Sequence, residues 1–367
     1  MKKILAALSI VLAACGSSSS EASSASGASS SSEASGTASS GSTGGGSTTT
    51  SSGTTSSSSA ASASSTGAGG GSGGAHPIGQ VTDVQPSSEC PGCQQLTVQC
   101  PGIEDNTAIL KVSEPGVPAQ GTIFAHNGGG GTDFYSHPNL DTYVAAGFRI
   151  ALVRWMSDWE QTKTAGILDG ACRPATVMKW VFDNVHQGGT SAAFCGIGQS
   201  GGSGVLAYML AHYGMDQILD YAALSAGPPF GRIDYGCAPE TYSGSLPELC
   251  SGDGSVSLAL PPDKLDPWEN TTTCGTGMPS SSDLAKWAAD SVVSPTASYA
   301  YPKTLVSFFD CMANPNGTTG GAYFYSQQIT SQHDVTCYTA CTGEELGSQG
   351  WSEYGAAVLD QCVPRHQ

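Results

Sequence analysis

A serine at position 200 lies among glycines, in a pattern that could make its hydroxyl a nucleophile. The apolar run Ala192 to Ile197 leads into Gly198-Gln199-Ser200-Gly201-Gly202, and the helical pattern VLAYMLAHYG follows. This order predicts a strand, a sharp turn and a helix, with the serine in the turn. The turn strains the serine's backbone and requires small neighbours, which glycines supply. A hydroxyl held in this way can attack a carbonyl carbon once a base takes its proton.

The same spacing of glycine and serine occurs at Gly70-Gly71-Ser72-Gly73-Gly74. That copy has no strand pattern before it and no helix pattern after it. Only the copy around Ser200 has this context, and there the motif resembles the nucleophile elbow of the α/β-hydrolases. The resemblance covers about residues 95–365 and extends to no named subfamily. It implies an α/β fold with a mostly parallel central sheet and helices on both faces.

The resemblance also implies a catalytic triad in the chain order Ser, Asp or Glu, His. Of the seven histidines, only His333 and His366 come late enough, and His366 lies at an end that we expect to fray. His333 follows the predicted strand Gly321–Tyr325, so His333 is the predicted general base. Asp310 directly follows the predicted strand Lys303–Phe309, at a carboxyl end where such folds collect function. Asp310 is therefore the predicted acid that orients the base.

Plainer interpretations exist for both residues. His333 could be a surface histidine, and Asp310 could be a turn residue that ends a strand. Asp334 is a weaker candidate for the acid because adjacent side chains rarely face each other. Asp283 and Asp290 lie in a region that we expect to form a cap, and they are weaker still.

A glycine-rich loop is predicted to complete the site. An oxyanion hole needs two backbone N–H groups directed at the charge that develops in the transition state. One is expected from Gly201, directly after the nucleophile. The segment His126-Asn127-Gly128-Gly129-Gly130-Gly131 resembles the HGGG-type loop of lipases and esterases with an asparagine inserted. The resemblance implies the second donor there, and we predict Gly128 and Gly129; a merely flexible loop is the alternative.

Strands and helices alternate along the domain, as a mostly parallel sheet requires. The first two strands alternate in polarity and are expected to form an antiparallel entry pair. The predicted strands are Gln95–Gln99, Thr107–Ser113, Gly121–Ala125, Phe148–Arg154, Ala192–Ile197, Tyr221–Ser225, Lys303–Phe309 and Gly321–Tyr325. The predicted helices cover residues 141–147, 176–185, 202–213 and 352–359. Residues 228–300, rich in Pro, Gly and Ser, interrupt this order where α/β-hydrolases carry a cap, so we predict a cap insertion there.

The first residues resemble a bacterial lipoprotein signal. Two lysines precede the apolar run Ile4 to Ala14, whose eleven residues are too few to span a bilayer. The run ends in Leu12-Ala13-Ala14-Cys15, which is similar to a lipobox. The resemblance implies export, removal of residues 1–14 and a lipid on Cys15, while an ordinary secretory signal is the alternative. Gly16, in place of an aspartate, favours sorting outward to the outer membrane or cell surface.

Composition divides the remaining chain in two. Residues 15–75 contain the lipidated cysteine and a linker of Ser, Gly, Thr and Ala with two glutamates. Such a linker has almost nothing to bury, so we expect it to be disordered, with a span of roughly 45 Å. Residues 76–367 have the length of one large α/β catalytic domain. The linker is therefore expected to hold this domain away from a membrane.

Thirteen cysteines point to a disulfide framework. With lipid on Cys15, an even number remains, which predicts up to six disulfides of open connectivity in an exported protein. Cys195, in the strand before the elbow, could instead be a free core thiol. A structural zinc site formed by Cys90-x-x-Cys93 and Cys337-x3-Cys341 is the alternative to disulfides at these four cysteines, and the oxidising compartment disfavours it.

The formal net charge of −17 argues against nucleic acid and anionic membrane surfaces as partners. The sequence thus predicts a tethered serine hydrolase acting on a small-molecule or polymeric carboxylic ester. We expect a monomer without cofactor or metal that meets the membrane only through its lipid. A peptidase or polyester depolymerase is an alternative within the same fold. A non-catalytic surface-binding lipoprotein on a degenerate hydrolase scaffold is the alternative outside the enzyme class.

Overall fold

The computed structural model describes residues 75–163, 165–242, 249–250, 274, 279–312 and 318–366. The predicted signal, Cys15, the linker and part of the predicted cap lie outside these ranges and stay predictions. Within the described ranges, no helix has both the length and the apolar character needed to cross a bilayer.

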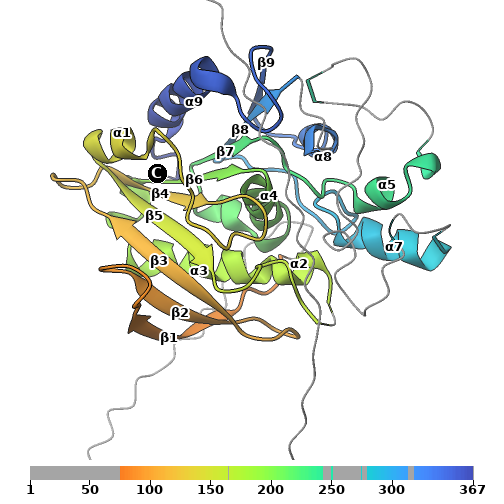
Figure 1. Cartoon of the computed structure of the whole chain (residues 1–367), viewed down its shortest axis with the longest axis horizontal. Helices are drawn as coiled ribbons and strands as arrows, with labels where there is room; N and C mark the ends of the chain where they lie inside the picture. Colours follow the sequence, from red (N-terminus) through yellow and green to blue (C-terminus); the bar gives the residue numbers. More distant parts are fainter. Residues whose placement is uncertain are drawn as a thin grey trace, which may run out of the picture. The chain divides into compact units, whose positions relative to one another are not determined.

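A nine-stranded sheet forms the centre of the described domain, in the order β1-β2-β3-β5-β4-β6-β7-β8-β9 (Figure 1). The first three strands and the β3–β5 pair are antiparallel, and the pairs from β5 through β9 are parallel. The strands are β1 Gln80–Pro86, β2 Gln94–Gln99, β3 Asn106–Ser113, β4 Gly121–His126, β5 Phe148–Trp155, β6 Ala193–Gln199, β7 Tyr221–Ser225, β8 Leu305–Cys311 and β9 His333–Tyr338. This confirms the predicted mostly parallel sheet with an antiparallel entry.

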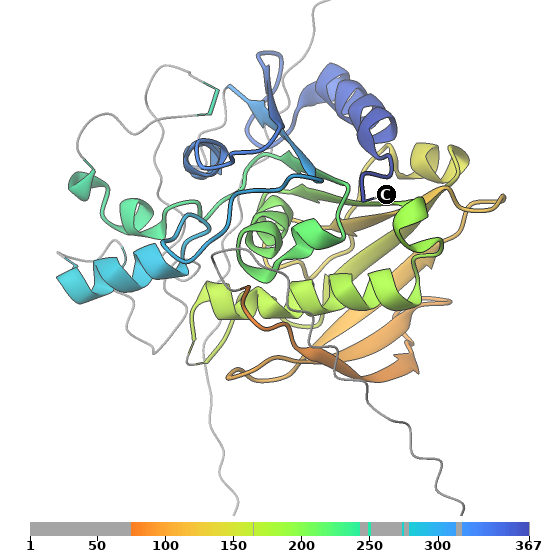
Figure 2. The same cartoon turned by 180° about the vertical axis from the view of Figure 1, so that it is seen from behind.

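Helices cover both faces of the sheet, which explains why strands such as β4, β7 and β8 are buried along their whole length. The helices are α1 Leu140–Ala145, α2 Ile167–Gly170, α3 Cys172–Asn184, α4 Gly201–Tyr213, α5 Ile233–Cys237, α7 Ser281–Asp290, α8 Thr318–Ser326 and α9 Gly347–Gln361. Residues of α3 and α4 belong to one hydrophobic core, and residues of α1 and α9 belong to a second. Figure 2 shows α3 and α4 across the face that they cover.

One predicted element has the wrong secondary structure. The segment Gly321–Tyr325, predicted as a strand, lies in helix α8, and the last strand is β9. A short apolar run cannot be assigned to a strand or a helix by periodicity alone. Its buried residues Ala322 and Tyr325 are three apart, as on one helix face. His333 is therefore the first residue of the last strand and does not lie in a loop beyond it.

Six disulfides brace the domain, as predicted. They are Cys90–Cys93, Cys100–Cys172, Cys195–Cys362, Cys237–Cys274, Cys250–Cys337 and Cys311–Cys341. Cys195 is not a free thiol, because it forms a disulfide with Cys362. This bond links β6 to the segment after α9. The four cysteines of the zinc alternative all form disulfides, so none of them offers a thiolate to a metal.

Candidate active site

Ser200 occupies the turn between β6 and α4, at the carboxyl end of β6. Its backbone has φ 51° and ψ −118°, a conformation that residues with a side chain rarely adopt. Its amide donates to the carbonyl of Ser225 on β7 at 2.9 Å, and its carbonyl accepts from the amide of Gly204 at 3.1 Å. The predicted strand, turn and helix are therefore present, with the serine in the strained position.

Packing explains the glycines around Ser200. A methyl group at Gly198 would overlap the backbone of Gly202. A methyl group at Gly202 would overlap the carbonyl of His126, and one at Gly201 would overlap the carbonyl of Gly129. Only glycines at these positions allow the loop after β4 to lie directly against the turn.

The loop after β4 brings the predicted oxyanion glycines to Ser200. A methyl group at Gly128 would lie 3.3 Å from Cβ of Ser200, and one at Gly201 would lie 2.7 Å from the amide nitrogen of Gly129. Among the described residues, neither the Gly128 nor the Gly129 amide donates a backbone hydrogen bond. The three glycines and the serine thus come together, and the direction of their N–H groups toward a bound carbonyl stays a prediction.

The side chain of His126 packs against this loop and fixes its position. Its Nδ1 donates to the carbonyl of Asn127 at 2.9 Å, and its Nε2 accepts from the indole of Trp155 at 2.9 Å. Burial lowers the pKa of His126 to about 4, so the ring is neutral at pH 7. A methyl group on Gly131 would lie 3.0 Å from Nε2 of the ring. Both ring nitrogens are engaged, so His126 positions the glycine loop and leaves no nitrogen for Ser200.

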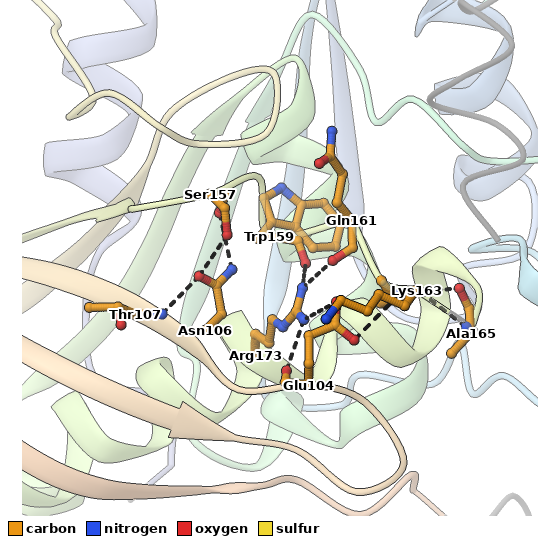
Figure 3. A network of polar contacts seen from close by, with 10 residues as sticks. Glu104, Asn106, Thr107, Ser157, Trp159, Gln161, Lys163, Ala165 and Arg173 are labelled. Atoms are coloured by element: carbon orange, nitrogen blue, oxygen red, sulfur yellow. Dashed lines mark hydrogen bonds and ion pairs between the residues drawn. The ribbon is translucent and has the colours of Figure 1, made fainter. Parts of the chain in front are cut away.

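A polar network anchors the segment that follows β5 (Figure 3). Arg173 on α3 is 1% exposed and donates to the carbonyls of Trp159 and Gln161 at 2.9 and 2.6 Å. It also donates to the carbonyl of Glu104 at 2.9 Å and pairs with the Glu104 carboxylate at 3.3 Å. The amide of Trp159 then donates to the carbonyl of Gly130 at 3.0 Å. Arg173 therefore holds the segment on which the glycine loop rests.

A carboxylate, and not an imidazole, contacts the hydroxyl of Ser200. The hydroxyl of Ser200 donates to Oε1 of Glu344 at 3.1 Å. The side-chain amide of Gln199 donates to the backbone carbonyl of Glu344 at 3.2 Å. Glu344 lies in a tight turn after β9, which paired backbone hydrogen bonds between Thr342 and Glu345 close. Glu344 is not among the predicted site residues, because the sequence pattern predicts the last strand too early in the chain.

His333 lies at the opposite edge of the sheet from Ser200. Gln199, the residue before Ser200, lies level with Ser225, Phe309 and Thr336 on the neighbouring parallel strands, and these residues define one row across the sheet. His333 starts β9 three residues before that row, and Ser200 lies one residue beyond it. The separation of four residues corresponds to about 13 Å along the strand direction, at about 3.3 Å per residue. It is also three strands away, and its Nδ1 donates to the carbonyl of Ser331 at 3.2 Å. The predicted position of His333 beside Ser200 is therefore wrong.

Asp310 lies at the predicted edge. It is fully buried at the carboxyl end of β8, and its Oδ1 accepts from the amide of Cys311 at 2.8 Å. The disulfide Cys311–Cys341 joins this strand end to the segment that carries Glu344. The structure thus places Asp310 and Ser200 at the same edge of the sheet, and the catalytic role of Asp310 stays a prediction.

The weaker candidates have other roles. His366, expected at a frayed end, is held near the start of β7 by an amide hydrogen bond to Asp220. Asp334 lies at the amino end of β9. Asp283 forms a capping box at the start of α7, and Asp290 accepts the first amides of α2. The side chains of Asp283 and Asp290 are thus bound to the starts of helices, and Asp334 lies at the end of β9 that is far from Ser200.

No protein-family model matches the sequence, and no curated protein matches it. Three solved structures illustrate the similarity found. Acetyl xylan esterase 1 from Thermoanaerobacterium sp. is 12% identical, with 76% of this chain and 87% of that chain covered and a TM-score of 0.43. The Pyrococcus horikoshii acylaminoacyl peptidase is 9% identical, with 74% of this chain and 42% of that chain covered and a TM-score of 0.44. Mouse alpha/beta hydrolase domain-containing protein 10 is 10% identical, with 72% of this chain and 97% of that chain covered and a TM-score of 0.43.

This chain spans less than half the length of that peptidase. Likeness at this level carries no information on activity, so the fold is assigned from the chain's own geometry. A parallel sheet with an antiparallel entry supports a strained serine between β6 and α4. The chain therefore has the α/β-hydrolase fold.

Proposed function

We propose that this protein is a serine hydrolase that cleaves carboxylic esters, with Ser200 as its nucleophile. The observation that carries the proposal is the backbone of Ser200, which is held at φ 51° between β6 and α4. Such strain costs about 1–3 kcal/mol for a residue with a side chain, and it persists chiefly at functional sites. A glycine would fill a purely structural turn without that cost.

The surroundings of Ser200 suit attack on a carbonyl. Gly129 is exposed and Ser200 is half-buried, so a substrate carbonyl can reach the hydroxyl beside the glycine loop. Amides of Gly201 and of Gly128 or Gly129 would stabilise the oxyanion that forms. Esters fit better than amides, because an alkoxide leaves more readily than an amine that must first be protonated. Acyl transfer to Ser200 and then to water needs no metal or cofactor.

A non-catalytic binding scaffold is the second candidate, and a specific observation favours it. All seven histidines lie in the described ranges, and none of them forms a hydrogen bond to Ser200. A Ser-His-Asp triad needs that contact. A scaffold that had lost its base would show the same arrangement.

The N-terminal sequence supports a proposal on the location of the protein. We propose that a lipid on Cys15 and the linker hold the domain at the bacterial envelope, at the outer membrane or cell surface. A monomer on such a tether can reach either small esters or an insoluble polyester. A peptidase on the same scaffold stays a weaker proposal, because an amide is less reactive than an ester and its nitrogen leaves only after it has been protonated.

Labelling with a fluorophosphonate tests the proposal. The purified protein should react, and mass spectrometry should find the adduct on the peptide that contains Ser200. A panel of p-nitrophenyl acyl esters should be hydrolysed by the same preparation. A folded protein that takes no label and hydrolyses none of the esters would instead support the scaffold.

A further inference from the structure

We propose that Glu344 is the general base and general acid for Ser200, in the place where a histidine would be expected. The inference rests on the proposed function and names the group that completes it. Its basis is the hydrogen bond from the Ser200 hydroxyl to Oε1 of Glu344, at 3.1 Å. A base must lie within about 2.6–3.2 Å of the proton that it removes, and Glu344 satisfies this distance.

Glu344 comes from the correct edge of the sheet. Its turn directly follows β9, so it lies at the carboxyl end of a strand parallel to β6. Ser200 follows the carboxyl end of β6, and ligands and chemistry collect at these ends in open parallel sheets. The contact joins residues 144 positions apart in the chain, so the fold creates it and local sequence does not.

Several contacts fix the position of the Glu344 turn. Gln199 binds its backbone carbonyl at 3.2 Å, beside the nucleophile itself. The next residue, Glu345, accepts from the indole of Trp351 on α9 at 3.0 Å. The disulfide Cys311–Cys341 fixes the start of the turn to the end of β8. Three separate elements thus hold the turn that carries Glu344, which preorganises its carboxylate to meet one hydroxyl.

The charged groups on the elements around Glu344 are acidic. Asp310 lies at the end of β8, Glu345 lies in the same turn, and Asp158 lies beside Gly130 of the glycine loop. Glu344 thus shares the carboxyl end of the sheet with other carboxylates of the described residues.

The proton and the electron pairs balance over both half-reactions. Glu344 takes the hydroxyl proton while Oγ bonds to the substrate carbonyl carbon, and the C=O π pair moves onto oxygen. The tetrahedral intermediate re-forms C=O and releases the alkoxide, which takes the proton from Glu344 and leaves as an alcohol. Glu344 then takes a proton from water as that water attacks the acyl-enzyme. Collapse of the second intermediate releases the acid, and Oγ regains its proton from Glu344.

A carboxylate base changes the pH dependence of such an enzyme. Carboxylates stay ionised at lower pH than imidazoles, so activity should continue below the pH at which a histidine base is protonated. A carboxylate is also the weaker base, so attack by Ser200 is slower than with imidazole. Activated esters should therefore be the best substrates.

Three substitutions at one position test the inference on the full chain. Glu344→Gln keeps the shape and removes the base, and should lower kcat on p-nitrophenyl acetate and the rate of fluorophosphonate labelling by about 10²–10⁴-fold. Glu344→His should retain activity but move the acid limb of the pH profile toward neutral pH. Glu344→Asp draws the carboxylate away from Oγ, and should lower kcat with little change in KM. Glu353→Gln is the matched control, because it removes the charge of an exposed glutamate on α9 that the proposed mechanism does not use, and it should stay within twofold of wild type.

The outcomes separate this inference from the proposed function. If the wild-type protein labels at Ser200 and Glu344→Gln labels at the same rate, the inference is overturned and the hydrolase stands. If the wild-type protein neither labels nor hydrolyses esters, the proposed function itself has failed. Should Glu344→Gln not fold, the Glu344→His profile decides: an acid limb identical to that of wild type overturns the inference, and a limb moved toward neutral pH supports it.

Discussion

The two edges of the central sheet differ in what their side chains can do. The carboxyl edge brings Ser200, the glycine loop and Asp310 together with Glu344. The amino edge carries His333, and a small cavity of about 120 Å³ lies there, lined by Tyr301, Pro302, Lys303, Thr304, Leu305, Gln332 and Arg365. Residue types suited to a triad thus occur at both edges, and at the carboxyl edge the hydroxyl of Ser200 meets the carboxylate of Glu344.

This difference shows that predicting a site residue requires the direction of its strand as well as the presence of the strand. His333 and Glu344 flank the same strand, β9, one at its start and the other just beyond its end. A strand of six residues spans about 17–20 Å, so the choice between its two ends decides whether a side chain can reach the nucleophile. An identification by residue type alone selects the histidine at the wrong end.

The largest effect is expected at the carboxyl edge. Ser200→Ala removes the proposed nucleophile and should lower ester hydrolysis by about 10⁴-fold or more, by analogy with triad deletions in other enzymes. It should also abolish fluorophosphonate labelling, because the reacting atom is gone. The folded state should persist, since alanine keeps the Cβ, and circular dichroism checks this. Ester hydrolysis that survives in the purified variant would move the active site away from this edge.

Two glycines of the carboxyl edge should differ strongly from each other. Gly201→Ala drives a methyl group into the carbonyl of Gly129, which displaces the glycine loop, and kcat should fall by about 10²–10³-fold. Gly129→Ala meets open space and carries only the strain of φ +56°, so its loss of kcat should be smaller. Gly116→Ala, with open space and no such backbone angle, is the control. Equal effects of the first two would show that the loop does not lie against the turn.

Much of the carboxyl edge could be predicted because its signals are local. Glycines adjacent to Ser200 in sequence are adjacent in the turn, and the apolar run KTLVSFF placed Asp310 at the end of a buried strand. The proposed base, Glu344, could not be found in this way. GGAYFY and HDVTCY are both short and partly apolar, and only packing of Ala322 and Tyr325 selects a helix for the first.

Long-range pairing also lay beyond the sequence. An even count of cysteines predicted up to six disulfides, but many pairings of them were possible. The bond Cys311–Cys341 matters most here, because it sets the turn of Glu344 beside the end of β8. The hydrogen bond between Ser200 and Glu344 was equally unpredictable, because the sequence next to either residue gives no sign of the other.

Acid should weaken the fold that supports the carboxyl edge. Burial lowers the pKa of His126 and of His212 from 6.5 to about 4. Between these values the unfolded chain binds more protons than the folded one, so stability is full above pH 6.5 and falls toward pH 4. For the fully buried His126 the loss is on the order of 3 kcal/mol, at 1.36 kcal/mol per pKa unit. Melting temperatures at pH 7.5, 5.5 and 4.5 should decrease in that order, and a flat series would contradict the burial of these rings.

The smallest effect is expected at the amino edge. His333→Ala should leave kcat and the labelling rate of Ser200 within twofold of wild type. The imidazole lies about 13 Å from the row of Ser200 along the strand direction and three strands away, and it cannot remove a proton over that distance. Its only hydrogen bond among the described residues goes to the carbonyl of Ser331, next to the start of β9. Loss of that bond should change stability by at most about 1 kcal/mol, and thermal unfolding measures the change. If His333→Ala abolished hydrolysis while Glu344→Gln did not, the base would belong to the amino edge, and the register of β9 against β8 would have to be wrong.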